Sequence, residues 1–401
     1  MEIIGKVVVY IIMACAVAGA VASIVKENSE LGNEFVEGIN SVGPIFLPVA
    51  GIMAAAPFIT AFVSSVFGPL FQAVGADPAM AATTFIAVDM GGYQLAEALA
   101  HTKESWIMAM TTGYMAGATI VFSIPVGLKM IQKKDQKYLA LGVMSGILTI
   151  PVGVLVSSVV MALTKPYIRD MISTDSAATY QLLMSYGDIF RNLIPLIIIC
   201  IIIAVGLLFK PDAMIRGFII FGRIMDSALK LVLVFSIVEY FTGFFSNIFG
   251  VWGFEPILAD QIDQVRALEV SGAIAMMLCG AFPMVYLIKK YLNKPLNAIG
   301  KKCGLSTDAT TGILAGAANI LALFAMIKDM KAEDKVKTIG FGVCGAFLIG
   351  DHLAFTANFQ PNLILPILCG KLVAGICAVA IATKIAVPKA KKLEEADSLL
   401  A

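Results

Sequence analysis

Long apolar stretches separated by short polar links make up most of the 401-residue chain. Many of these stretches reach about 20 residues, the length that an α-helix needs to cross the hydrocarbon core of a membrane. A helix satisfies all its own backbone groups in lipid, and the stretches are too long and too uniformly apolar for barrel strands. The pattern therefore predicts an all-α, polytopic membrane bundle of about 10–11 hydrophobic segments, near residues 6–25, 41–67, 79–98, 106–130, 138–163, 190–209, 214–245, 267–290, 308–327, 337–358 and 362–386.

Two of these segments contain residues that favour a broken or re-entrant helix. The stretch TTGILAGAANILALF (310–324) combines threonines and glycines with Asn319, and GPIFLPVAGIMAAAPF (43–58) holds three prolines. Non-helical backbone at membrane depth survives only beside a cavity or inside protein. We therefore expect one or two broken elements in the bundle.

Basic links give the expected orientation of the segments. Lysines and arginines gather after alternate pairs of segments, which places these links on one side, and basic links lie on the cytoplasmic side. The acidic links 27–37 and 255–263 are expected on the opposite side. The basic links are at 129–137, 210–223 and 289–302.

The C-terminal part of the chain breaks this alternation. The basic link 328–337 and the lysines of the tail share the cytoplasmic side only if segment 308–327 does not cross the membrane fully. A re-entrant segment there restores the rule. The chain is then expected to form a single transmembrane domain, residues 1–388, followed by a short charged cytoplasmic tail, residues 389–401.

Composition agrees with a membrane environment and excludes several functions. Of all residues, 59% are hydrophobic and 14% charged, and the mean hydropathy is +0.89, whereas soluble domains carry nearer a quarter charged residues. A net charge of +1 gives no basic field for nucleic acid. The seven cysteines form no CxxC pair, so we interpret them as free thiols rather than zinc ligands. No cofactor motif is present, and the expected partners are the lipid bilayer and a small molecule.

An acid and an imidazole stand side by side in an otherwise apolar run, FLIGDHLAF (347–355). A charged Asp near the centre of a membrane helix costs about 2.5–3.5 kcal/mol, so such residues usually face a cavity or a partner. No Lys or Arg lies within a turn or two of Asp351, which favours a functional role over a structural ion pair or a protonated, hydrogen-bonded acid. For His352, a proton relay and a hydrogen bond across a helix interface both remain open.

Asp89 is a second acid in an apolar setting, in AVDMGGYQLA (87–96). Tyr93 follows it at i+4 and would share its helix face. Phe355 has the same spacing from Asp351. A carboxylate with an aromatic ring beside it suits an ammonium group, because the acid supplies charge and the ring face a cation–π contact.

Small and capping residues predict local packing. Three pairs of glycines at i and i+4 favour close helix contacts, and ADPAM (76–80) offers Asp77 as a helix cap with Pro78 at the first helical position. The glycine pairs are Gly113/Gly117, Gly142/Gly146 and Gly312/Gly316.

Several longer stretches resemble a known family. The chain contains VDMGGYQLAEALA (88–100), ATIVFSIPVGL (118–128), YLALGVMSGILTIPVG (138–153), RALEVSGAIAMMLCGAFPMV (266–285) and GDHLAF (350–355). Their form and order resemble the membrane protein of bacterial ethanolamine-utilisation operons, and the likeness covers most of the chain. The resemblance implies an ethanolamine permease of the bacterial cytoplasmic (inner) membrane, with no enzymatic activity of its own.

Two positions depart from the pattern of that family. Val88 stands where a Cys is expected before Asp89, and Asn319 is a single Asn where a pair is expected. The first change hardly matters for function. The second puts in doubt any role that needs two adjacent amides near Asn319.

The residue pattern and the resemblance together predict a site for a small ammonium compound that carries one hydroxyl. We expect Asp89 and Asp351 to line one midplane site and to face the ammonium, with Tyr93 or Phe355 at its flank. The hydroxyl would be received by Asn319, Thr311 or Gln94, and His352 completes the set.

Two other classes of function stay open. One is an intramembrane enzyme with Asp89 and Asp351 as paired acids, although the chain has no nucleophile or metal motif. The other is a membrane sensor or scaffold without flux, although a receptor would more usually carry a sizeable extramembrane domain.

Overall fold

The structure is a computed structural model that describes residues 2–261, 263–302 and 304–400. Its regular structure is helical apart from one small hairpin of β1 (Tyr167–Ile168) and β2 (Tyr180–Gln181). The helices of the first half are α1 (Glu2–Val25), α2 (Glu30–Asn40), α3 (Val42–Ala54), α4 (Ala56–Val66), α5 (Gly68–Ala73), α6 (Ala79–Phe85), η1 (Val88–Met90), α7 (Gly92–Leu99), α8 (Lys103–Thr112), η2 (Gly113–Ser123), α9 (Ile124–Met130), η3 (Lys133–Asp135), α10 (Gln136–Ile147) and α11 (Ile150–Thr164).

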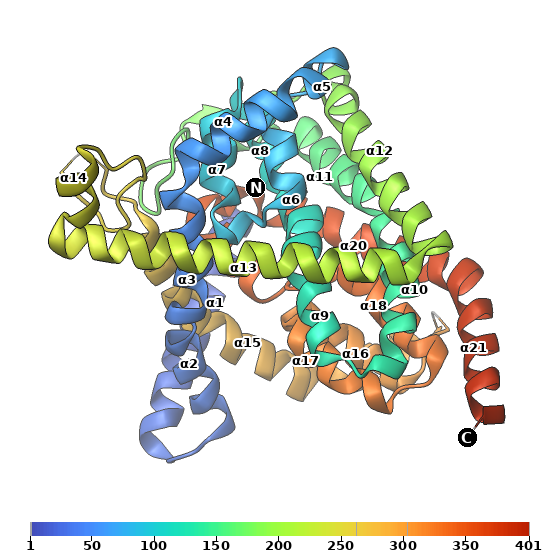
Figure 1. The fold of residues 1–401 in the computed structure, drawn as a ribbon. Helices are drawn as coiled ribbons and strands as arrows, with labels where there is room; N and C mark the ends of the chain where they lie inside the picture. The colour runs from blue at the N-terminus through green and yellow to red at the C-terminus, as the bar shows by residue number, and fades with distance from the viewer. Residues whose placement is uncertain (1, 262, 303, 401) are drawn as a thin grey trace.

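The second half continues the helical bundle, and the long helix α13 lies across α3 and α9 (Figure 1). Its helices are α12 (Tyr186–Phe209), α13 (Pro211–Thr242), α14 (Phe244–Phe249), α15 (Ala267–Lys302), α16 (Thr307–Ala318), α17 (Ile320–Met326), η4 (Ile327–Asp329), α18 (Ala332–Gly345), α19 (Asp351–Phe359), η5 (Pro361–Leu363), α20 (Ile364–Ile381), η6 (Ala382–Ala386) and α21 (Val387–Leu400).

The predicted all-α membrane bundle is confirmed, with fewer uninterrupted spans than segments. Every predicted apolar segment is helical, but only seven helices in the described chain are long and apolar enough to cross a membrane. Segments 79–98, 308–327 and 337–358 are each interrupted, and α13 carries several charged residues. The seven helices are Glu2–Val25, Glu30–Ala54, Lys103–Met130, Lys133–Thr164, Tyr186–Phe209, Ala267–Lys302 and Pro361–Ala396.

The predicted break in segment 308–327 is present at Asn319, between α16 and α17. Helix α16 ends before Asn319, whose side-chain Oδ1 accepts the backbone N–H of Leu321 at 2.9 Å and starts α17. Gly312 and Gly316 of α16 both pack against Leu323 of α17, so α17 folds back along α16 as a helical hairpin. The second predicted break, in 43–58, falls at Ala55, between α3 and α4.

Two further breaks lie in segments that the sequence indicated as continuous. Residues 86–91 separate α6 from α7, and residues 346–350 separate α18 from α19. The second loop donates Phe347 N–H to Gly316 O at 3.1 Å and Ile349 N–H to Ala317 O at 2.9 Å. It thereby satisfies carbonyls that the end of α16 leaves free, which makes non-helical backbone tolerable inside the protein.

The glycine pairs allow the close contacts that their spacing predicted. Gly117 of η2 lies directly against the backbone of Ile86, so the first of the two loops rests on η2. Gly142 and Gly146 of α10 face Ile339 and Val343 of α18. A side chain at any of these glycines would force the two elements apart.

Hydrogen bonds and ion pairs gather most basic links at one end of the bundle. Lys335 pairs with Asp135 at 2.7 Å, Ser306 Oγ donates to Asp334 at 2.8 Å, and Lys391 of the tail pairs with Glu333 at 2.8 Å. These contacts bring the links near 135, 304 and 334 together with the tail helix α21. The structure therefore agrees with the re-entrant interpretation of 308–327.

The expected position of the first acidic link is wrong. Tyr286 Oη donates to Glu30 at 2.6 Å and accepts a hydrogen bond from Lys290 at 3.2 Å. The α1–α2 turn therefore lies beside the lysine-bearing half of α15, at the same end as α16, α17 and α21 (Figure 1). Acidic residues contribute little to membrane orientation, which explains why their position misled.

Candidate functional site

A cavity of about 280 Å³ lies where the broken segments meet α2, α3 and η2. Asp89 comes from η1, Asn319 from the break between α16 and α17, and Asp351 and His352 from the start of α19. Four of the eight predicted site residues are therefore brought to one cavity by segments far apart in the sequence. The other lining residues are Glu37, Ser41, Pro44, Ile45, Pro48, Ala87, Met90, Ala118, Phe122, Leu278, Phe282, Leu321 and Phe347.

The two aspartates of the cavity, Asp89 and Asp351, have no lysine or arginine beside them in its described wall, and Glu37 is a third acid there at an exposed position. Asp351 is the first residue of α19, where the helix dipole favours a negative charge, and its Oδ1 is buried without a hydrogen-bond partner among the described residues. Asp89 is half-buried in the turn before Gly91, which takes a positive φ of 91°. None of the described lining residues is a lysine or an arginine. The wall thus presents negative charge that a cation would compensate.

Tyr93 and Phe355 lie outside the lining of this cavity. Both rings are fully buried, with centroids 5.5 Å apart, and Tyr93 also stacks on Trp106 at 4.8 Å. The Tyr93 hydroxyl accepts a hydrogen bond from Gln360 Nε2 at 2.9 Å. The two rings therefore pack on each other and do not form part of the cavity wall.

Other aromatic rings line the cavity instead. Phe122 of η2 and Phe347 of the 346–350 loop have ring centroids 5.9 Å apart, and Phe282 of α15 joins them in the wall. Phe347 has a positive φ of 58°, which is unusual for a bulky residue. Backbone strain of this kind persists only where the surrounding structure holds the residue in place. No spacing rule links these three phenylalanines, since each comes from a different segment.

Thr311 and Gln94 also lie away from the cavity lining. Thr311 Oγ1 donates to Thr307 O within α16 at 2.9 Å, at a half-exposed position. Gln94 is buried in α7, and neither atom of its side-chain amide meets a partner in the described chain. Of the three residues expected to receive a hydroxyl, only Asn319 lines the cavity.

Lys371 is a residue that the sequence reasoning missed. It lies in the apolar helix α20, is only 1% exposed, and places its Nζ 2.9 Å from His352 Nδ1 and 3.0 Å from Tyr114 O. A lone lysine in the apolar run LPILCGKLVAGIC (365–377) was the signal available. The contact between Lys371 and the site was not recognised because Lys371 is distant from Asp351 along the chain.

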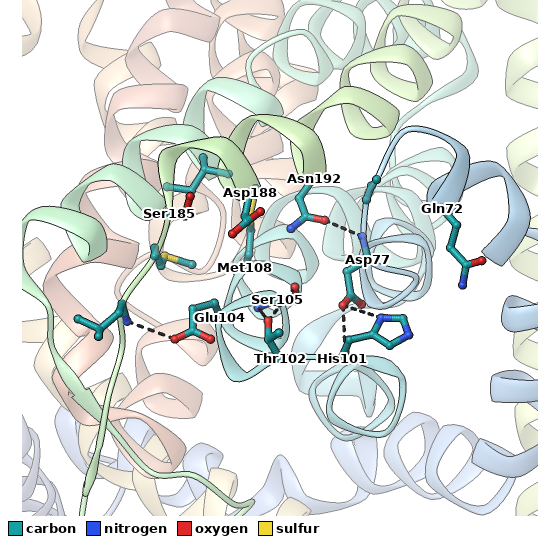
Figure 2. Close-up of a pocket in the computed structure, with 15 residues that line it drawn as sticks. Gln72, Asp77, His101, Thr102, Glu104, Ser105, Met108, Ser185, Asp188 and Asn192 are labelled. Carbon is teal, nitrogen blue, oxygen red and sulfur yellow. Dashed lines mark hydrogen bonds and ion pairs between the residues drawn. The ribbon is translucent and has the colours of Figure 1, made fainter.

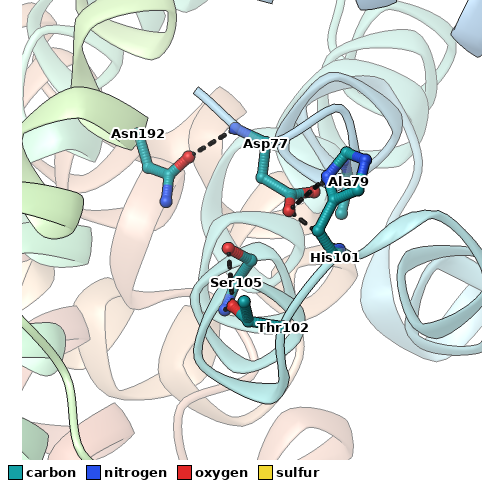
Figure 3. A network of polar contacts seen from close by, with 6 residues as sticks. All are labelled: Asp77, Ala79, His101, Thr102, Ser105 and Asn192. Carbon is teal, nitrogen blue, oxygen red and sulfur yellow. Dashed lines mark hydrogen bonds and ion pairs between the residues drawn. The ribbon is translucent and has the colours of Figure 1, made fainter. Parts of the chain in front are cut away.

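A second pocket, of about 410 Å³, contains Asp77, His101, Glu104, Asp188 and Asn192 (Figure 2). It lies at the start of α6, the turn between α7 and α8, and the start of α12. Its acids differ from those of the first cavity, because Asp77 is held by hydrogen bonds from every side (Figure 3).

Asp77 fixes both ends of the broken segment that carries Asp89. One carboxylate oxygen accepts Ala79 N–H at 2.9 Å, as the predicted cap does, and the other accepts His101 N–H at 2.9 Å and lies 3.1 Å from its Nδ1. The backbone N–H of Asp77 donates to Asn192 Oδ1 at 2.7 Å. Since α6 begins and α7 ends at this carboxylate, it positions the loop between them.

The described residues contain no cluster of three or more His, Cys, Asp or Glu side chains that would hold a metal ion. Six cysteines are free thiols, as expected, and Cys303 lies outside the described residues. Fold and site together define a polytopic helical membrane protein with a small, acid-lined internal cavity between broken helices.

Comparison with known proteins identifies the family. The family described as "Ethanolamine utilisation protein, EutH" matches residues 4–385, and the chain belongs to this family. It is similar to a protein of Listeria monocytogenes serotype 1/2a (strain 10403S) named "Probable ethanolamine permease EutH", with 39% identity over 379 residues that cover 94% of this chain and 93% of that protein.

Two further relatives have similar coverage. A protein of Escherichia coli (strain K12) with the same name is 36% identical over 89% of this chain and 86% of its own length. The "Uncharacterized protein YxeR" of Bacillus subtilis (strain 168) is 33% identical over 94% of each chain. No solved structure matches the chain.

Proposed function

We propose that this protein takes up ethanolamine across the bacterial cytoplasmic membrane and binds it as an ammonium ion in the cavity of Asp89 and Asp351. The observation that carries the proposal is the pair of aspartates from distant segments in one cavity, with no hydrogen-bond partner for Asp351 Oδ1 among the described residues. The names of the relatives, which are probable ethanolamine permeases, support the substrate.

The chemistry of ethanolamine matches this cavity. An aliphatic amine has a pKa near that of Lys, about 10.4, so the ammonium form dominates at neutral pH. Phe122, Phe282 and Phe347 offer apolar walls and ring faces to that ammonium. A cavity needs roughly 10–15 Å³ to hold one water, so a volume of about 280 Å³ admits a small amino alcohol together with water.

Asn319 is the residue that we assign to the hydroxyl. Its Oδ1 is already used by the N–H of Leu321, so the amide NH₂ is left to donate to a ligand oxygen. The carboxylates of the wall serve the ammonium, because ionised acids only accept hydrogen bonds. One donor and two acceptors then meet the two ends of one small molecule.

The architecture supports transport rather than chemistry on the substrate. Broken helices that meet beside a cavity are the usual setting of substrate sites in membrane transporters. With the basic end of the bundle in the cytoplasm, an inside-negative potential favours entry of a monovalent cation by about 2.3 kcal/mol per 100 mV. Accumulation then requires no coupled ion.

Uptake of labelled ethanolamine into proteoliposomes tests the proposal, at two pH values and with and without an imposed potential. We expect Asp351→Asn and Asp89→Asn each to lower uptake at least tenfold at low substrate concentration, because each removes a charge that compensates the ammonium. Asp226→Asn is the matched control, since this acid pairs with Lys230 at 2.8 Å on the exposed face of α13.

The outcomes separate the three classes of function. Accumulation by the wild type that depends on the potential and on both acids supports the proposal. Unchanged uptake by both variants removes the carboxylates from the site. Conversion of ethanolamine by the purified protein would indicate an enzyme, and no flux at all would indicate a sensor or scaffold.

A further inference from the structure

Lys371 is the one described cation that the protein buries directly behind the acid-lined cavity. Its Nζ donates to Tyr114 O at 3.0 Å and lies 2.9 Å from His352 Nδ1, and no carboxylate lies among these hydrogen-bond partners. Lys371 and Asp89 are nevertheless close enough to interact electrostatically. The lysine therefore belongs to the charge of the site without blocking either acid.

The hydrogen bond from Lys371 fixes the state of His352. A protonated lysine can only donate, so with Lys371 as an ammonium Nδ1 must accept; we therefore assign a neutral imidazole with its proton on Nε2. The ring is held between Tyr114 and Phe347, with centroid distances of 4.8 and 5.1 Å. His352 thus adds no charge to the cavity.

Charge counting at the cavity leads to one net negative charge. The count takes Asp89 and Asp351 as ionised, Lys371 as protonated and His352 as neutral, and it leaves out Glu37 of α2, which lines the cavity at an exposed position. Burying an uncompensated charge away from water is costly. A ligand with one positive charge makes the buried set neutral, whereas a ligand with two leaves it charged.

We propose that Lys371 is a specificity-determining residue, a fixed internal cation that makes the cavity accept monoammonium compounds and reject diammonium compounds of similar length. The inference rests on the proposed function and adds the charge class of its substrate. In this proposal the ammonium of Lys371 supplies the second positive charge that a diamine would otherwise bring to the two aspartates.

Competition binding to the purified protein in detergent tests this selectivity. Labelled ethanolamine is displaced by unlabelled ethanolamine or by 1,3-diaminopropane, whose two amines are both largely protonated at neutral pH. We expect Lys371→Met to shift the ratio of the two inhibition constants at least tenfold toward the diamine. Lys371→Arg keeps the charge and should keep the wild-type ratio. Lys384→Met, which removes an exposed lysine of η6, is the matched control.

A second pair of variants covers the case in which Lys371→Met alone fails to fold or to bind. Asp89→Asn/Lys371→Met and Asp351→Asn/Lys371→Met both restore a single negative charge. Recovered binding with the wild-type preference for ethanolamine in either double variant supports the proposal. No recovery in both contradicts it, as does an unchanged ratio in a folded Lys371→Met protein.

The failure of this inference differs from a failure of the proposed function. If the wild-type protein binds no ethanolamine, the proposed substrate is wrong. If it binds ethanolamine but Lys371→Met leaves the preference for monoamine over diamine unchanged, only the role of Lys371 is wrong.

Discussion

The two polar pockets contain the same residue types and hold them in opposite ways. Each has an aspartate next to a histidine, yet Asp77 receives hydrogen bonds at both carboxylate oxygens, while Oδ1 of Asp351 has no partner among the described residues. The pocket of Asp77 is the larger, at about 410 Å³ against 280 Å³. Completeness of hydrogen bonding, rather than pocket size, therefore separates a structural acid from one that is free to meet a ligand.

Asp77→Ala tests the structural role of Asp77 and should have the largest effect on stability. The change leaves Ala79 N–H and His101 N–H without their acceptor, and losing a helix cap together with a buried partner costs about 2–4 kcal/mol. We expect a lower thermal unfolding midpoint in detergent, with a smaller loss of ethanolamine uptake than in Asp351→Asn, because the loop with Asp89 is loosened while both aspartates of the cavity remain.

Asp351→Asn is the counterpart on the other side of the comparison. It removes an unpartnered buried charge, so its unfolding midpoint should stay near that of the wild type while uptake is lost. If Asp351→Asn unfolds early, or Asp77→Ala abolishes uptake without loss of stability, the two acids have been assigned to the wrong roles.

Gly350→Ala should have the next largest effect, because it perturbs the backbone that carries Asp351. A Cβ at this position would collide with the carbonyl oxygen of Ala318 at the end of α16. Overpacking of this kind costs about 1–3 kcal/mol, and the shift would also displace Phe347 and Asp351. We expect a lower unfolding midpoint together with weaker ethanolamine binding.

Gly217→Ala provides the control for that substitution. Its Cβ would meet no atom within 4 Å on the exposed face of α13. Ala is also the better helix former, by about 1 kcal/mol. A Gly350→Ala protein as stable as wild type would show that the 346–350 loop moves easily, and the tight contact with α16 would then not position the site.

The hydrophobic pattern predicted the bundle and the re-entrant element, because apolar length and helix-breaking residues are local signals. The breaks at 86–91 and 346–350 were missed for a physical reason. Each is stabilised by contacts from elsewhere, the first by Gly117 of η2 and the second by free carbonyls of α16. Residues within the segments themselves give little indication of such partners.

The sequence indicated those site residues that are individually unfavourable in lipid. Asp89, Asp351, His352 and Asn319 stand out because each is polar in an apolar run, and all four line the cavity. The choice of Tyr93 and Phe355 followed from helical spacing. Gly91 interrupts the helix between Asp89 and Tyr93, whereas Asp351 and Phe355 do share α19 and the Phe355 ring packs against Tyr93. Lys371 meets His352 only through the packing of α20 against the start of α19.

Glu333 represents a third kind of acid, partly exposed and hydrogen-bonded to Lys391, and should give the smallest effect. The hydrogen bond from Lys391 lowers the pKa of Glu333 from its ordinary value of 4.5. A lowered folded-state pKa means that the pair stabilises the docking of α21 fully above that ordinary value and loses this contribution as the pH falls through the folded value. The side chains are 31% and 55% exposed, so at most about 1 kcal/mol is at stake.

Hydrogen exchange in the amides of α21 can detect a contribution of this size. At neutral pH, Lys391→Met should exchange faster there than the wild type, and the difference should shrink as the pH falls through the lowered folded-state pKa of Glu333. Lys389→Met, at an exposed position of the same helix, should match the wild type at both pH values. A difference that persists in acid would mean that Lys391 holds the helix by packing its aliphatic stem, because the charge of Glu333 is then absent.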